Sequence, residues 1–170
     1  MPALSAGRQV GPGDQVVVAG QGFNPGVSGG GGVGYDGSAI AFTAVRATPR
    51  SLSGLYGEGR VNFERSLTNL GGGWVAREPG VFTTPASGVY SFSWTGLSRA
   101  GSELRLDLVV NQLEMGSSWA DREGYQAAGG QVVLGLRRGD RVWLRQVQGE
   151  IYEPADCDRG YTRLTGYRIA

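Results

Sequence analysis

The chain has 170 residues, carries a formal net charge of +1 and contains no histidine. This length suits one domain, or one domain with a tail, and 40% hydrophobic with 18% charged residues is typical of a globular protein. The near-neutral charge creates no strong field toward nucleic acid or an anionic membrane, so neither is expected as a partner. The lack of histidine excludes Ser/His/Asp and Cys/His catalysis and histidine-ligated zinc.

Residues 1–38 are rich in glycine and poor in residues that could form a core. We predict a largely unstructured, flexible leader here, in which Val16–Ala19 could add an edge strand. Because the glycines do not recur at every third position, a collagen triple helix is excluded within this chain. The chain has no signal-peptide stretch and no apolar run near the roughly 20 residues needed to cross a bilayer.

From residue 39 onward, short segments alternate between apolar and polar side chains, and Gly, Pro, Asn or Asp separate them. This period of two predicts β-strands, and no segment has the spacing of an amphipathic helix. The expected inward-facing side chains, in chain order, are Ile40, Phe42, Ala44, Val61, Phe63, Tyr90, Phe92, Trp94, Leu104, Leu106, Leu108, Val110, Val132, Leu134 and Leu136. The run Val142–Leu144 and a closing strand within 161–169 follow, which predicts an all-β sandwich or jelly roll.

Two runs of residues point to a known family. The first is Gly80-Val-Phe-Thr-Thr-Pro85 continuing through Ser87-Gly-Val-Tyr-Ser-Phe92, and the second is Leu136-Arg-Arg-Gly-Asp-Arg-Val-Trp-Leu144. Asn69 with the glycines before Trp74, and a final Thr165-Gly-Tyr167, stand in matching order. With these motifs, residues 39–170 resemble the globular-head domain of the C1q family, which is related in fold to tumour necrosis factor.

This resemblance implies a ten-stranded C1q/TNF-like jelly roll that forms a homotrimer or a heterotrimer with other C1q-like chains. The sequence departs from the family at Leu164, where an aromatic residue is usual. The side chains expected to form the core or the trimer contacts are Phe42, Phe82, Tyr90, Phe92, Trp143 and Tyr167.

The resemblance also implies a function. It predicts a non-enzymatic, extracellular module that binds a protein or a charged surface, in innate recognition or in signalling. The alternative is the trimerisation head of an extracellular matrix scaffold. A hydrolase with paired carboxylates is disfavoured, because nothing in the sequence suggests an acid held in an apolar pocket.

Calcium is the one cofactor that the resemblance suggests, since some family members bind it near the trimer axis. The corresponding loop offers Asp121 and Glu123, but Gln126 stands where one family acid is expected. Calcium needs six to eight oxygen ligands in most sites, so a solvated loop without a metal is the alternative.

A second acidic group precedes the last strand and is expected to form an interaction surface, because long loops on a rigid sandwich often carry binding sites. Its residues are Glu150, Tyr152, Glu153, Asp156 and Asp158. An ordinary solvated loop is the alternative. Trp119, in a Gly-Ser-Ser-Trp segment, is a further candidate for ligand contact, although burial in the core or a subunit interface is favoured over exposure. The single cysteine, Cys157, is expected to be an incidental loop thiol rather than an interchain link.

The tripeptide Arg138-Gly139-Asp140 matches the integrin-binding sequence. It also lies between two apolar strands, where a glycine adopts positive φ at little cost, so a tight turn is the expected role. Many arginines alternate with apolar residues along the predicted strands, which indicates outward sheet faces. A basic patch for anionic ligands is the alternative for these arginines.

Overall fold

The chain folds into two antiparallel sheets in a computed structural model that describes residues 38–47, 55–56, 59–75, 77–154 and 159–170. None of these residues lies in an α-helix. The leader predicted for 1–38 therefore lies, apart from Ser38, outside the described residues. In the described part, no helix is long and apolar enough to span a membrane.

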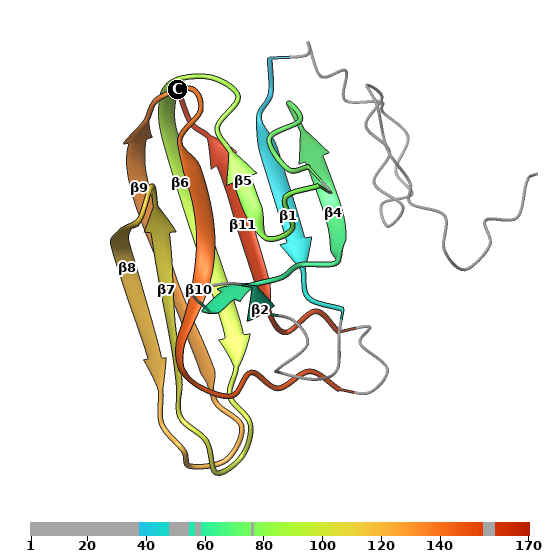
Figure 1. Cartoon of the computed structure of the whole chain (residues 1–170), viewed down its shortest axis with the longest axis vertical. Helices are drawn as coiled ribbons and strands as arrows, with labels where there is room; N and C mark the ends of the chain where they lie inside the picture. Colours follow the sequence, from blue (N-terminus) through green and yellow to red (C-terminus); the bar gives the residue numbers. More distant parts are fainter. Residues whose placement is uncertain (1–37, 48–54, 57–58, 76, 155–158) are drawn as a thin grey trace, which may run out of the picture. The chain divides into compact units, whose positions relative to one another are not determined.

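The first sheet has the strand order β4-β1-β11-β6-β9 and the second has β2-β3-β10-β7-β8, with β5 also paired to β10 (Figure 1). The strands of the first sheet are β1 (Ala41–Val45), β4 (Arg65–Leu70), β6 (Gly88–Leu97), β9 (Ala127–Leu136) and β11 (Arg163–Arg168). Those of the second are β2 (Leu55–Tyr56), β3 (Arg60–Val61), β5 (Val81–Thr83), β7 (Leu104–Val110), β8 (Leu113–Ala120) and β10 (Arg141–Gly149). The predicted all-β jelly-roll sandwich is confirmed.

The core lies between the two sheets and follows the period-two pattern of the sequence. Tyr90, Phe92 and Trp94 on β6 are at most 4% exposed, as are the leucines of β7. Rings pack closely within this core, and the centroids of Phe42 and Phe82 lie 4.4 Å apart. Each such side chain contributes about 1.5–3 kcal/mol through burial, so the aromatic residues dominate the stability of the sandwich.

The large side chain of Trp94 on β6 fits into the core because two glycines, one on β8 and one on β9, face it. A Cβ atom on Gly116 or Gly130 would lie 2.8 Å or 2.4 Å from the indole ring. The indole Nε1 donates a hydrogen bond of 2.9 Å to the buried Ser118 hydroxyl, so its polar atom is satisfied inside the core. Larger residues at either glycine would displace this ring.

The sandwich has two ends that differ in what they contain. At the terminal end, the last residues close the first sheet, since Val89 N donates to the Ala170 carbonyl and Arg168 N to the Ile40 carbonyl. At the opposite end, which we call the loop end, three connections meet: residues 98–103, 121–126 and 150–154 (Figure 1). The loop end is the part of the fold that brings sequence-distant loops together.

Candidate functional site

Backbone hydrogen bonds join the three connections of the loop end into one surface. Ser98 N donates to the Gln126 carbonyl at 2.7 Å, and Arg99 N donates to the Glu150 carbonyl at 3.0 Å. Gly101 N reaches the Arg122 carbonyl at 3.2 Å. Loops that are far apart in sequence are therefore held in one relative position, as a binding surface requires.

Aromatic side chains are the most exposed apolar groups of this surface. Trp119 is 59% exposed and Tyr125 is 57% exposed. The Tyr125 ring packs on Tyr152, with centroids 4.6 Å apart and an interplanar angle of 57°. Exposed tyrosine and tryptophan are the residue types that dominate the energetics of protein contacts, so this end offers anchors for a partner.

Charged groups surround these aromatic residues in matched pairs. Glu103 accepts hydrogen bonds from Arg122, from Trp119 Nε1 at 3.5 Å and from Gln148 Nε2 at 2.8 Å. The hydrogen bond from Arg122, and then the one from Trp119, hold the pKa of Glu103 below its ordinary value. Arg99 and Glu150 form a second, exposed pair at 3.5 Å. The polar rim thus fixes the position of Trp119 without giving the surface one dominant charge.

The residues predicted in the acidic loop fall into three groups. Glu150 and Tyr152 lie on the loop end, as does Trp119 from the other predicted loop. Glu153 is 4% exposed, so it is not part of an exposed interaction surface. Asp156 and Asp158, together with Cys157, lie outside the described residues.

Glu153 is an internal group because its polar partners are also internal. Its Oε1 accepts a hydrogen bond of 2.8 Å from Thr162 N, and Thr162 is fully buried. Burial raises the pKa of Glu153, against the opposing effects of Thr162 and of the positive charge on Arg46. Arg46 is itself fully buried, and its backbone N donates to the Thr162 carbonyl at 2.9 Å. Glu153 therefore anchors the connection between β10 and β11.

The predicted calcium loop forms an ordinary turn around one carboxylate. Asp121 Oδ1 accepts a hydrogen bond of 2.9 Å from Glu123 N, and Gln126 Nε2 donates 3.0 Å to the Glu123 carbonyl. In the described part of the chain, no three or more acidic, cysteine or histidine side chains gather as a metal site. One copy of this loop supplies fewer oxygen ligands than calcium prefers, so calcium binding stays a prediction.

Two neighbouring cross-strand rows on the outer face of the first sheet carry no charged side chain. Cross-strand pairing places Ala41, Tyr167, Ser91 and Val133 in one outward row, and Thr43, Thr165, Ser93 and Gln131 in the next. We call these two rows, with the adjoining Val89 and Ile169, the uncharged face. Its apolar members are exposed: Val89 38%, Val133 54%, Tyr167 48% and Ile169 55%. Because protein surfaces are normally rich in charge, this depletion is typical of the centre of an interface.

The outer face of the second sheet differs, because it carries an ionic network around a buried acid. Asp107 is fully buried and accepts hydrogen bonds from Arg105 Nε at 3.1 Å, Arg145 at 3.0 Å and Ser117 Oγ at 2.6 Å. Burial alone would raise the pKa of Asp107, but the hydrogen bonds from Ser117, Arg145 and Arg105 outweigh it and lower the pKa. Glu114 completes the network at 3.2 Å from Arg105.

Trp143 packs on this same outer face. It lies between its cross-strand neighbours Val81 and Val109, with which it forms a separate buried cluster, and it is 7% exposed. Phe42, Phe82, Tyr90 and Phe92 lie in the main core instead, each at most 1% exposed. Trp143 therefore stabilises the pairing of β5, β10 and β7 rather than the contact between the sheets.

The Arg138-Gly139-Asp140 segment forms the turn between β9 and β10. Gly139 has a φ of 92°, which favours glycine. Asp140 is engaged at both carboxylate oxygens, accepting from Asn111 Nδ2 at 2.8 Å and from Arg137 N at 2.7 Å. The hydrogen bond from Arg137, and then the one from Asn111, lower the pKa of Asp140. These contacts give the tripeptide a structural role.

Comparison with known proteins places this fold in a family. The model of the C1q domain matches residues 41–167. Complement C1q tumor necrosis factor-related protein 2 of Homo sapiens is 28% identical over 141 residues, covering 80% of this chain and 47% of that protein. Caprin-2 of Danio rerio is 34% identical over 116 residues, covering 66% of this chain and 12% of that protein.

The chain thus spans less than half the length of these curated relatives. Solved structures support the same fold. The globular domain of zebrafish complement 1qA protein superposes with a TM-score of 0.60 at 21% identity, covering 77% of this chain and 98% of the other. Murine APRIL at pH 5.0 superposes with a TM-score of 0.61 at 11% identity, covering 78% of this chain and 100% of the other. Since the domain match covers most of the described residues, the chain belongs to the C1q domain family.

Proposed function

We propose that this chain is a non-enzymatic recognition module that works as a trimer of C1q-like subunits. Membership of the family makes it a C1q/TNF-like binding or trimerising module. The finer proposal is that the uncharged face joins the subunits and that the loop end contacts the ligand. An extracellular location belongs to the same proposal, since the family resemblance implies it.

The uncharged face is the observation that carries the proposal. Two complete cross-strand rows on four neighbouring strands contain only apolar, hydroxyl and amide side chains. Leu113 at 67% and Met115 at 39% exposure add apolar groups on β8, the last strand of the second sheet. The uncharged face of one copy packs on the β8 edge of the next in this proposal, and a head-to-tail contact of this kind forms a closed ring when the rotation between successive copies closes.

A pair of matched tyrosine variants tests the assembly. Tyr167→Asp places a charge on the uncharged face, whereas Tyr125→Asp places one on the loop end at a similar exposure, 57% against 48%. We expect Tyr167→Asp to become monomeric in light scattering and Tyr125→Asp to stay trimeric, because an unpaired buried charge is costly. Equal masses for the two variants would contradict the assignment of the face.

The ligand of the loop end is tested with an array of glycans, bacterial surface polymers, immunoglobulin and membrane lipids, read with and without a calcium chelator. We expect the chain to bind particular compounds on the array and Trp119→Ser to weaken that binding, since this side chain is the largest exposed group of the loop end. Threefold repetition strengthens binding by avidity. Binding lost on chelation would support the calcium prediction, and retention would contradict it.

The alternative function is that of a trimerisation head within a larger scaffold protein. It is favoured by the relatives, in which the matching segment is only 47% or 12% of the full length. A trimer that shows no specific spot on the array supports this alternative against recognition.

A further inference from the structure

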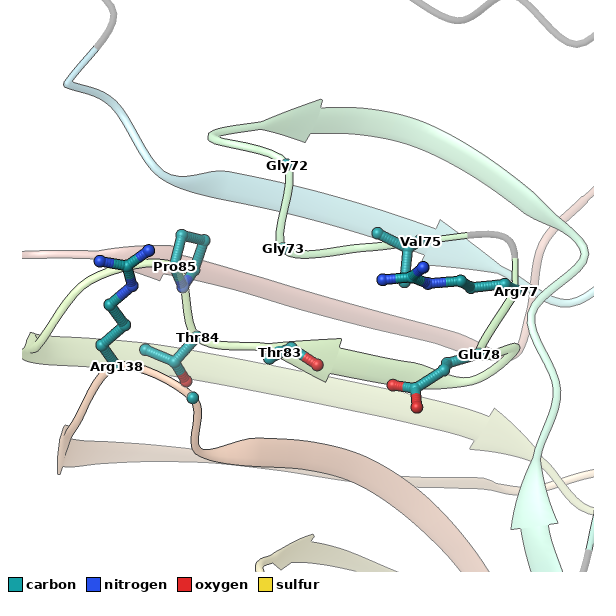
Figure 2. Close-up of a pocket in the computed structure, with 10 residues that line it drawn as sticks. Gly72, Gly73, Val75, Arg77, Glu78, Thr83, Thr84, Pro85 and Arg138 are labelled. Atoms are coloured by element: carbon teal, nitrogen blue, oxygen red, sulfur yellow. The ribbon is translucent and has the colours of Figure 1, made fainter.

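An open depression of about 610 Å³ lies away from the loop end and from the uncharged face. Its walls are the loop after β4, the residues from Thr83 to Pro85 and the turn between β9 and β10 (Figure 2). Neither the proposed ligand surface nor the proposed subunit contact uses these segments. The depression is therefore distinct from both proposed surfaces, and one copy of the chain is enough to form it.

Hydrogen bonds between the backbones of the three segments fix the walls. Thr83 N donates to the Gly73 carbonyl, Thr84 N to the Asp140 carbonyl and Gly139 N to the Thr84 carbonyl, each at 2.8 Å. Asn69 holds the glycine loop from outside, because its amide donates 2.8 Å to the Trp74 carbonyl and accepts from Trp74 N. The shape thus exists before any ligand arrives, which lowers the entropic cost of binding.

Two guanidinium groups flank this depression. Figure 2 shows the Arg77 side chain extended beneath Val75 and the Arg138 side chain rising beside Pro85, with Gly73 and Thr84 between them. Both arginines are exposed, and neither forms an ion pair within the part of the chain that the structure describes. The depression therefore presents two cationic groups that no carboxylate of the described residues neutralises.

The carboxylates close to the depression are already engaged. Glu78, which lines it, accepts from Arg141 at 3.3 Å. Asp140, in the adjoining turn, is held by Asn111 and by the backbone of Arg137. The local field at the depression is consequently positive, although the net charge of the whole chain is only +1.

The lining offers no fully exposed apolar anchor, because its apolar side chains Val75 and Pro85 are half-buried. None of the large apolar side chains that are exposed in the described residues lines the depression. Gly72 exposes its backbone there, and a Cβ on it would meet nothing within 4 Å. A hydrophilic ligand with anionic groups at both ends fits this surface better than a peptide that needs apolar anchors.

We propose that the depression binds a sulfated polysaccharide, with Arg77 and Arg138 each taking one sulfate group. The planar guanidinium fork offers paired N–H donors that match the oxygens of sulfate. Because the two arginines stand on different walls of the depression, a chain with repeated anionic groups engages both, whereas a single small anion engages one.

The test measures binding of a size-defined heparin hexasaccharide to the full chain at physiological ionic strength. We expect Arg77→Ala and Arg138→Ala each to weaken binding by about fivefold, and the double variant by more. Arg65→Ala is the matched control, because Arg65 is an exposed residue of β4 outside the depression and its loss changes the net charge equally. We expect it to change affinity less than about twofold.

Three results would overturn the proposal. An equal loss in Arg65→Ala would show attraction by overall charge, and tighter binding of an acidic peptide would show a protein ligand. Complete competition by inorganic sulfate at low concentration would show a site for a small anion. Light scattering on the same samples measures the oligomeric state independently of binding. A monomer that binds the hexasaccharide would support the binding site and contradict only the proposed trimer.

Discussion

The rings of Tyr125 and Tyr152 pack with their centroids 4.6 Å apart, and this contact joins two loops that are separate in sequence. Tyr125 belongs to the β8–β9 connection and Tyr152 to the connection that follows β10. An isolated bridge between Ser98 and Ile151 supports the second loop from the end of β6. The loop end is therefore one surface whose parts depend on each other.

Because the two rings touch, their contributions to stability are coupled. Tyr125→Ala, Tyr152→Ala and the double variant should show a coupling of about 0.5 kcal/mol in the free energy of unfolding, at the low end for aromatic pairs because Tyr125 is half exposed. Urea denaturation of the four proteins measures it. Strictly additive losses would mean that the two loops are independent.

Asp107 is expected to be the most sensitive charged residue of the second sheet. Asp107→Asn removes the charge of the buried one of the two carboxylates that Arg105 and Arg145 share, and we expect a loss of about 3 kcal/mol. Glu114→Gln is the control, because this carboxylate is 41% exposed in the same network and should cost at most about 1 kcal/mol. Chemical denaturation at neutral pH compares the two, and similar losses would argue against the central role of Asp107.

The same residue gives the stability an acid dependence of known sign. Its pKa is lower in the folded chain than in the unfolded one, so its contribution is present above the ordinary aspartate pKa and disappears as the pH falls through the folded value. The stability difference between the wild type and Asp107→Asn should therefore begin to shrink below about pH 5 and keep shrinking as the pH falls below about 4. A difference that stays constant over this range would contradict the ion-pairing of Asp107.

Gly166 is a position where the core leaves no room for a side chain. A Cβ there would lie 2.6 Å from Phe42 and 2.7 Å from Phe92, so Gly166→Ala should cost about 1–3 kcal/mol. Gly135→Ala is the control in the same sheet, because its Cβ would meet nothing within 4 Å. Thermal unfolding should show a clear loss for the first variant and little change for the second.

Alternation in the sequence predicted the inward faces well, because each strand must bury every second side chain. Tyr90, Phe92 and Trp94 follow this rule. The pattern specifies a face but not what covers it, and Asp107 illustrates the difference. It alternates with the inward leucines of β7 and lies on the outward face, yet it is fully buried because Arg105 and Arg145 lie across it.

The loop end was the part of the site that the sequence predicted least. Glu150, Tyr152 and Trp119 were recognised as two separate groups, and Tyr125 and Glu103 were missed. Their association depends on the pairing of β6 with β9 and of β7 with β8, which brings residues 98–103 and 121–126 to the same end. For Tyr125, the sequence signal that could have indicated a surface contact was an aromatic residue within a polar loop. Glu153 was placed with the surface acids because nothing in the sequence pairs it with Arg46.

Sedimentation equilibrium of the full chain over a range of concentrations measures whether the chain forms a trimer, which it must do if the uncharged face is the contact between subunits. We expect a mass of three times 17.9 kDa that does not change with concentration well above the dissociation constant of the trimer. A mass of 17.9 kDa at every concentration would contradict it.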